Sequence, residues 1–201
     1  MRGAGVGSAG VGVAWLALAR TEGMCVAPGQ REPVGSVQDI QMPVGGVADQ
    51  IYFICLVPEK RNEITTEGGL NLEKISIKKL NLLLSICISN NIQLSAFINP
   101  KKKIIDIAQR LGFHAVELHT GPLDKDKVNK IDIKKINEMI NYSYKKNLVV
   151  NIGHGLNFNN IKYIKNRKKV DTVHIGHFII SEAIFLSLPK VIKIFKNLIK
   201  L

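Results

Sequence analysis

The chain has 201 residues and a net charge of +12, from 28 Lys and Arg against 16 Asp and Glu. This length provides one or two ordinary domains with a real hydrophobic core. A hydrophobic content of 46% with 22% charged residues excludes collagen-like, coiled-coil and wholly disordered classes. The positive charge predicts an anionic partner: nucleic acid, an anionic membrane or phosphorylated small molecules.

Cysteine usage indicates the compartment. Cys25, Cys55 and Cys87 are odd in number and widely spaced, so they predict no disulfide framework. The chain has no CxxC pair that would indicate a zinc site. We therefore expect a reducing, cytoplasmic environment and no bound metal.

The composition changes abruptly near Gln50–Ile51. Residues 1–50 contain 10 of the 17 glycines and no lysine, with three basic and four acidic side chains. Residues 51–201 carry 25 basic and 12 acidic side chains and are rich in Lys, Ile and Asn, whose codons are rich in A and T. This change predicts two segments of different origin, united by fusion or by a gene-model join. We divide the chain into an irregular or disordered segment, 1–50, and a folded domain, 51–201.

The first segment has an alternative interpretation. Arg2, the apolar stretch Val11–Leu18 and the small residues that flank Leu18 resemble a secretory signal, although glycines interrupt the stretch. No run reaches the ~18 apolar residues that a membrane span needs. Residues 20–50 show neither helical nor strand periodicity and contain three prolines, which predicts loose structure.

From residue 51 the pattern alternates between short apolar runs and amphipathic segments. The runs typical of buried strands are Ile51–Val57, Gln93–Ile98, Phe113–Leu118, Leu148–Ile152 and Thr172–Ile175. The segments that indicate helices are Leu72–Ser89, Lys101–Leu111, Ile131–Lys146, Asn159–Asn166 and Leu188–Leu201. Five strand-then-helix units predict a parallel α/β sheet, and periodicity alone leaves a barrel and an open sheet as alternatives.

Polar or glycine-containing motifs follow every predicted strand: PEKR, FINP, ELHTG, NIGHG and HIGH. A barrel builds its active site from the loops at all carboxyl strand ends, whereas an open sheet binds at one switch point, so this distribution favours a barrel. His119, His154, His174 and His177 lie at these ends, which favours a functional site over isolated structural histidines. A zinc site competes with this interpretation, but no HxH or HExxH spacing occurs.

Four motifs resemble those of the pyridoxine 5'-phosphate synthase family. They are LVPEKRNEITTEGGL at 56–70, VELHTG at 116–121, NIGHGLNFNN at 151–160 and HIGHFIISEAIF at 174–185, and the resemblance extends over residues 54–185. It implies a partial (β/α)8 TIM barrel made of the last five strand-helix units. It also implies condensation of 1-deoxy-D-xylulose 5-phosphate with 3-amino-2-oxopropyl phosphate to pyridoxine 5'-phosphate, in vitamin B6 biosynthesis. No organic cofactor or metal is expected, and the family assembles as a multimer.

The resemblance assigns two catalytic residues. His154 matches the family's proton donor, and an imidazole can protonate a leaving hydroxyl or phosphate near neutral pH. Glu117 matches the residue that stabilises the transition state, where a carboxylate offsets cationic imine or enamine character. Because Glu117 lies in a short buried strand, it needs a buried partner, which favours a functional role.

Four further residues match substrate contacts. Thr65 matches a contact to the deoxyxylulose phosphate, with a helix cap as its structural alternative. Gly155, Gly176 and His177 match contacts to the amino-ketone phosphate, and Gly176 has strand termination as its alternative. Glycines let the backbone approach a ligand closely and direct amide groups at it.

The sequence also departs from the family pattern. Residues 1–50 lack the Asn/Asp-His motif, the basic phosphate loop and the His and Glu general bases of the first three strands. His174 stands where the pattern has Asn. A barrel of ~250 residues is incomplete here, so we expect two open sheet edges and a chain that is inactive alone. The alternative is a non-catalytic basic interaction protein that retains a barrel fragment. Lysines on helix faces without interleaved aromatics do not favour nucleic acid, and no membrane partner is expected.

Overall fold

A computed structural model describes residues 15–19, 24–27, 53–58, 68–124 and 128–199. Thr65 lies outside these ranges, so its predicted substrate contact stays a prediction. None of the described helices is both long enough and apolar enough to cross a bilayer.

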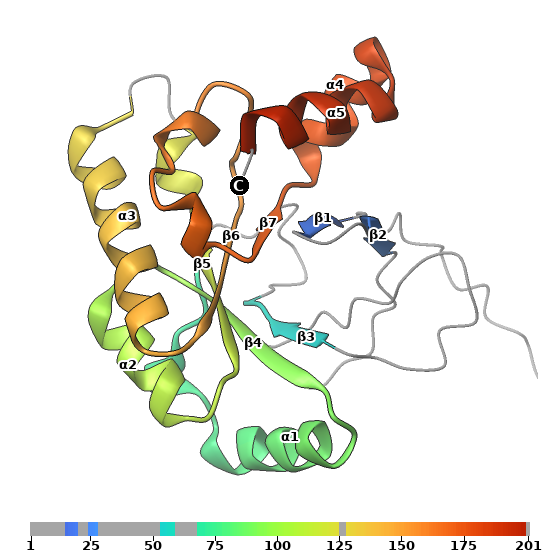
Figure 1. The fold of residues 1–201 in the computed structure, drawn as a ribbon. Coiled ribbons are helices and arrows are strands. Elements are labelled where there is room, and N and C mark those ends of the chain that lie inside the picture. The colour runs from blue at the N-terminus through green and yellow to red at the C-terminus, as the bar shows by residue number, and fades with distance from the viewer. Residues whose placement is uncertain (1–14, 20–23, 28–52, 59–67, 125–127, 200–201) are drawn as a thin grey trace, which may run out of the picture.

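The described strands form one sheet of seven, in the order β2-β1-β7-β6-β5-β4-β3 (Figure 1). Their bounds are β1 (Trp15–Ala19), β2 (Met24–Ala27), β3 (Phe53–Leu56), β4 (Gln93–Ile98), β5 (Ala115–His119), β6 (Val149–Gly153) and β7 (Thr172–His174). The five strands from β3 to β7 run parallel to one another. This confirms the predicted α/β class, and the sheet with its helices is a half-barrel consistent with part of a (β/α)8 barrel.

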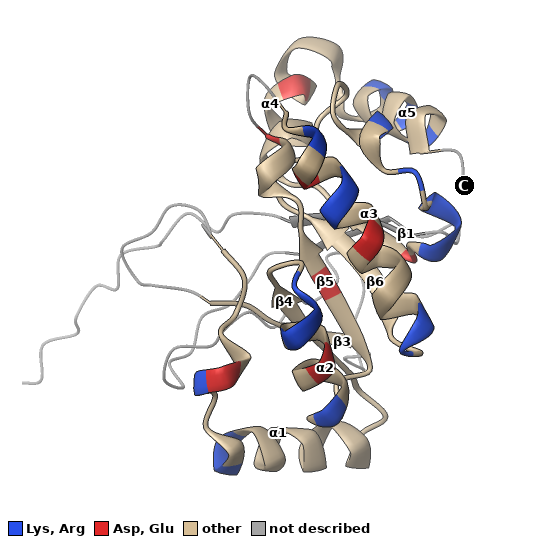
Figure 2. Ribbon diagram, turned by 90° about the vertical axis from the view of Figure 1, so that its left-hand side faces the viewer, with Lys and Arg blue, Asp and Glu red and all other residues tan. Residues whose placement is uncertain are grey.

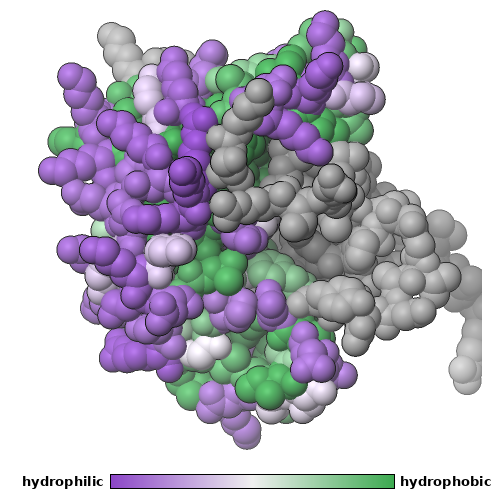
Figure 3. Space-filling model, viewed as in Figure 1, coloured by the Kyte–Doolittle hydropathy of each residue, from purple (hydrophilic) through white to green (hydrophobic). Residues whose placement is uncertain are grey.

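Helices lie between successive parallel strands from β3 to β6 and after β7. They are α1 (Ile77–Ser89), α2 (Lys102–Arg110), α3 (Lys130–Lys145), α4 (His177–Leu186) and α5 (Leu188–Ile199). In Figure 1, α2 and α3 lie together on one side of the sheet, and α4 and α5 lie beyond β7. Lys and Arg are spread over the helices and adjoining turns in Figure 2, and hydrophilic side chains gather over α2 and α3 in Figure 3. The lysines of these elements therefore lie mainly on solvated helix surfaces, as the sequence predicts.

The two faces of the parallel sheet differ chemically. One alternate set of strand residues, including Leu94, Val116 and Ile152, belongs to the hydrophobic core beneath the helices. The other set is buried and more polar. It includes Cys55, Ser95, Phe97, Glu117, His119, Asn151, Gly153 and His174, together with the apolar Ala115. Because side chains alternate across a strand, every residue of this second set faces the inner side of the half-barrel.

The N-terminal strands correct the expectation of irregular structure over 15–19 and 24–27. β1 pairs with β2 and also with β7, antiparallel in both cases, with Ala17 opposite His174. The edge strand β7 presents unpaired backbone groups, and a second segment can pair with them even if the side chains of that segment show no strand pattern. One of the two edges predicted to be open is therefore covered by this chain's own β1. The division of the chain into segments 1–50 and 51–201 is based on composition alone and stays a prediction.

Two helix predictions also differ from the structure. The segment predicted as one helix from Leu72 begins as a 3-10 turn, Leu72–Lys74, and α1 starts only at Ile77. The helix predicted at Asn159–Asn166 is absent from these described residues, which form a short 3-10 turn at Ile161–Tyr163. Asn side chains that bond to nearby backbone compete with helix formation there.

Helix α4 is missing from the prediction. Its sequence, HFIISEAIFL, has no clear polar face, so helical periodicity gives no signal. Ile179 is fully buried, whereas Ile184 and Phe185 on the same helix are exposed.

Candidate active site

The carboxyl ends of β5, β6 and β7 bring the polar inner-face residues together. Glu117 and His119 lie on β5, Gly153 ends β6 and is followed by His154, and His174 ends β7. β5 has a single acidic position, the red segment within the sheet in Figure 2. Parallel strands end at a common edge, so residues far apart in sequence converge there.

Glu117 has the buried partner that its position demands. The Nδ1 atom of His174 lies 2.6 Å from its Oε2 atom, and the two residues are 8% and 6% exposed. The Cys55 thiol also donates to Oε2, with Sγ 3.7 Å away. Burial by itself lowers the pKa of His174, but the charge of Glu117 and the hydrogen bond to it outweigh this and raise the pKa above its usual value.

The turn after β6 has an uncommon backbone. His154 and Gly155 have φ angles of +74° and +71°, in the left-handed region that a non-glycine residue rarely adopts. Two neighbouring side chains hold the turn. Thr120 Oγ1 lies 2.7 Å from the carbonyl oxygens of both Gly153 and His154, and Asn160 Nδ2 donates to the Gly155 carbonyl at 2.7 Å. Backbone strain of this kind is typical of functional sites.

We expect Thr120→Val to lower the free energy of unfolding by about 1–3 kcal/mol, because it removes the hydroxyl while keeping the side-chain shape. The His154 carbonyl would lose the Thr120 Oγ1 bond that helps to hold the turn. Urea denaturation of the full chain measures the change. Thr120→Ser keeps the donor and should restore most of the loss. Equal stability of the Val variant and the unaltered chain would show that the hydroxyl does not support the turn.

Three rings meet beside this turn. The His119 and His154 ring centroids are 5.0 Å apart, and Phe97 contacts His119 edge-on at 5.3 Å. Burial lowers the pKa of His154, His177 lowers it further, and Glu117 and Asp124 act in the opposite direction. Burial, assisted by His154 and opposed by Glu117, lowers the pKa of His119 to about 4. His119 is therefore neutral at physiological pH.

His119 should make stability depend on pH. Between its unfolded pKa of about 6.5 and its folded pKa of about 4, the unfolded chain binds a proton that the folded chain does not. The free energy of unfolding therefore falls as the pH decreases through this window, by about 2 kcal/mol between about pH 7.5 and about pH 5. Urea denaturation across that range measures the slope. Phenylalanine keeps a ring but has no titrating group, so His119→Phe should remove the contribution of His119 to this slope. Identical slopes in the variant and the unaltered chain would show that His119 does not have the lowered pKa.

Gly176 and His177 lie at the start of α4. Gly176 is the buried cap residue of the helix, and its carbonyl accepts the Ile180 amide at 3.2 Å. The amides of the first helical turn have no acceptor within the helix, and the helix dipole favours an anion near them. The exposed His177 and the half-buried His154 interact electrostatically. The structure thus brings Glu117, His154, Gly155, Gly176 and His177 to one end of the sheet.

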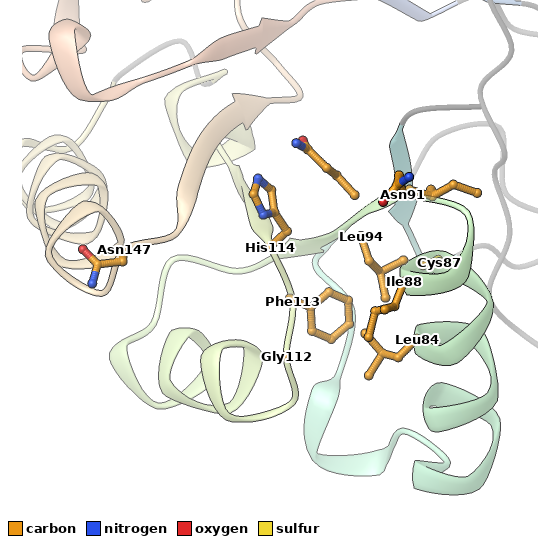
Figure 4. A pocket seen from close by; sticks show the side chains of 11 residues that line it. Leu84, Cys87, Ile88, Asn91, Leu94, Gly112, Phe113, His114 and Asn147 are labelled. Atoms are coloured by element: carbon orange, nitrogen blue, oxygen red, sulfur yellow. The ribbon is translucent and has the colours of Figure 1, made fainter. Parts of the chain in front are cut away.

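A cavity of about 570 Å³ lies elsewhere, at the amino ends of β4 and β5. Figure 4 shows it between the end of α1, with Leu84, Cys87 and Ile88, and the loop that carries Phe113 and His114. It contains none of the predicted site residues. Within the described residues, no three His, Cys, Asp or Glu side chains are placed to hold a metal ion.

Sequence reasoning did not assign four residues that shape the site. His119 and His174 were noticeable as histidines at strand ends, but their contacts with His154 and Glu117 depend on strand pairing. Thr120 and Asn160 lie inside the ELHTG and NIGHGLNFNN motifs, and only the motifs themselves indicated them. Their hydrogen bonds to the turn show why these positions matter.

Comparisons with known proteins agree with these motifs. A family model described as pyridoxal phosphate biosynthesis protein PdxJ matches residues 46–201. The chain is 39% identical over 152 residues to the pyridoxine 5'-phosphate synthase of Blochmanniella floridana, covering 74% of this chain and 61% of that protein. It is 41% identical over 150 residues to the synthase of Pelagibacter ubique, covering 73% and 62%.

The chain spans about three fifths of the length of these curated relatives. The match includes all five parallel strands and every described site residue, from Glu117 to His177. This chain therefore belongs to the family of pyridoxal phosphate biosynthesis protein PdxJ.

Proposed function

We propose that this chain supplies the proton-donating and phosphate-binding part of a pyridoxine 5'-phosphate synthase, as the last five strand-helix units of its barrel. The observation that carries the proposal is the convergence of Glu117 and His154 beside the first turn of α4. The substrates would be 1-deoxy-D-xylulose 5-phosphate and 3-amino-2-oxopropyl phosphate. They would be joined with loss of phosphate and water, and no metal or organic cofactor would take part.

His154 would act as the proton donor. Its imidazole is half-buried, and its lowered pKa makes the imidazolium a stronger acid toward a leaving hydroxyl or phosphate. The negative charge of Glu117 raises the same pKa and so counteracts part of the burial effect. Glu117 itself would stabilise cationic imine or enamine character as it develops, since a carboxylate in a buried site acts strongly on a nearby charge.

The phosphate of the amino ketone would bind at Gly155, Gly176 and His177. The position of these residues supports this, because Gly176 and His177 form the amino end of α4, and the free amides of a helix amino end favour an anion. An added Cβ at Gly155 would lie 2.7 Å from the Asp124 Cβ, so the turn has room for hydrogen only. Thr65 would contact the other substrate. We also propose a cytoplasmic location and a homo-oligomeric assembly.

The experiment supplies the general bases of the family's first three strands, which residues 1–50 lack. The full chain is assayed for pyridoxine 5'-phosphate with both substrates, alone and after coexpression with the part of the Blochmanniella floridana synthase that precedes its matched region. We expect product only from the coexpressed pair, because the first strands of the family pattern carry the general bases. His154→Asn should abolish product, whereas His114→Asn, at the opposite end of β5, should retain it.

Two outcomes would overturn the proposal. One is a folded pair, with both polypeptides copurifying, that forms no product. The other is a pair whose turnover is unaffected by His154→Asn. Either result would favour the alternative of a non-catalytic basic interaction protein.

A further inference from the structure

Glu117 and His174 do not lie on neighbouring strands. β6 separates them, and on the inner face the strand register aligns His119 with Gly153 and Gly153 with His174. A Cβ at Gly153 would lie 2.0 Å from Glu117 Oε1 and 3.0 Å from His174 Cβ. The carboxyl group of Glu117 therefore passes over the bare backbone of Gly153 to reach His174.

The two oxygens of Glu117 have different surroundings. Oε2 accepts from His174 Nδ1 at 2.6 Å and from the Cys55 thiol at 3.7 Å. Oε1 lies against Gly153, the residue that leads directly into His154. Contacts at Oε2 therefore fix the carboxyl group, and Oε1 lies next to the turn that carries His154, the proposed proton donor.

Among the described residues, two charged groups act on His174. Glu117 acts on it from β5, and Asp171 acts on it from the residue before β7. Its other neighbouring strand, β1, has the sequence WLALA, which contains no titratable side chain. Cys55, on β3, contacts the shared oxygen. Within the described residues, no Lys or Arg forms an ion pair with Glu117.

We propose that His174 is a positioning residue: it holds the Glu117 carboxylate as its buried cationic partner and thereby sets how much negative charge the site presents to His154. This proposal rests on the catalytic roles proposed above for Glu117 and His154. A protonated His174 makes the pair neutral overall, whereas a neutral residue in its place leaves Glu117 as an isolated negative charge. An isolated carboxylate attracts a proton on His154 more strongly, because the interior screens charges less than water does.

The test follows the histidine side chains of the isotope-labelled full chain by NMR as a function of pH. In the unaltered chain, we expect His174 to remain protonated above about pH 6.5, the ordinary pKa of a histidine side chain. In His174→Asn the amide can donate from the place of Nδ1 but carries no charge. We expect the pKa of His154 to rise in this variant by about 0.5–1 unit. His114→Asn, the matched control, should leave the His154 titration unchanged.

The opposite results would overturn the proposal: a His174 that is neutral near pH 7 in the unaltered chain, or a His154 titration that does not change in His174→Asn. If His174→Asn does not fold, the protonation state of His174 near pH 7 in the unaltered chain decides whether the proposal stands. A second readout uses the coexpressed pair. Because a proton donor must be protonated to act, His174→Asn should move the alkaline limb of the pH profile of kcat to higher pH, following His154, and change KM little. Absence of product would overturn the proposed synthase function, whereas the NMR titration tests the ion pair whether or not product forms.

Discussion

Gly153→Ala is expected to destabilise the chain by about 2–3 kcal/mol and to separate Glu117 from His174. The added methyl group would lie 2.0 Å from Glu117 Oε1, and Glu117 is held on its other side by the 2.6 Å contact with His174. The carboxyl group must therefore move away from the methyl group, and we expect this movement to take Oε2 away from His174 Nδ1. Urea denaturation measures the loss, and the His174 imidazole signal in the NMR spectrum reports the broken pair.

Gly68→Ala is the matched control for this substitution. Among the described residues, the nearest atom to a Cβ at Gly68 would be Asn99 Nδ2, 4.0 Å away. The free energy of unfolding of Gly68→Ala should therefore change by less than about 0.5 kcal/mol. If Gly153→Ala matched this control in stability and kept the His174 signal, the route of Glu117 over Gly153 would be wrong.

Glu117→Gln is expected to reduce kcat of the coexpressed pair by about 100–1000-fold. The amide keeps the shape and one oxygen acceptor, but it removes the charge that would stabilise a cationic intermediate. The substitution also removes the charge that raises the pKa of His174, so that histidine should become neutral.

The loss of charge has a second, separable consequence for stability. A raised folded pKa of His174 stabilises the chain below the unfolded pKa of about 6.5, and this stabilisation is lost as the pH rises through the folded value. Glu117→Gln should therefore flatten this part of the pH dependence in urea denaturation. Glu138→Gln is the control, since its carboxylate is exposed and pairs only loosely with Lys134 at 3.9 Å. An activity loss of similar size in both variants would contradict a specific role for Glu117.

The strands show what a local pattern can predict. β4 has the predicted bounds, Gln93–Ile98, because an apolar run of this length buried on both faces has few alternatives to a parallel strand. Helix α4 shows the limit of the same reasoning, because a segment apolar on several sides carries no periodic signal. The segment Asn159–Asn166, predicted as a helix, forms only a 3-10 turn, and Asn157 and Asn160 shape the loop at its start. Their side chains accept from each other's backbone amides at 2.8 and 2.9 Å, and such bonds compete with a helix.

The sequence by itself determined the alternation of strands and helices, the family motifs and the placement of histidines at strand ends. These features depend on residue type and spacing along the chain, which are local. Only the tertiary structure decided that Glu117 reaches His174 across Gly153, and that β1 covers the edge of β7. Both depend on which strands are neighbours and in which register. Hydrogen bonds between distant segments set that register. Composition therefore shows the +12 charge but not the buried Glu117–His174 pair on which the proposed chemistry depends.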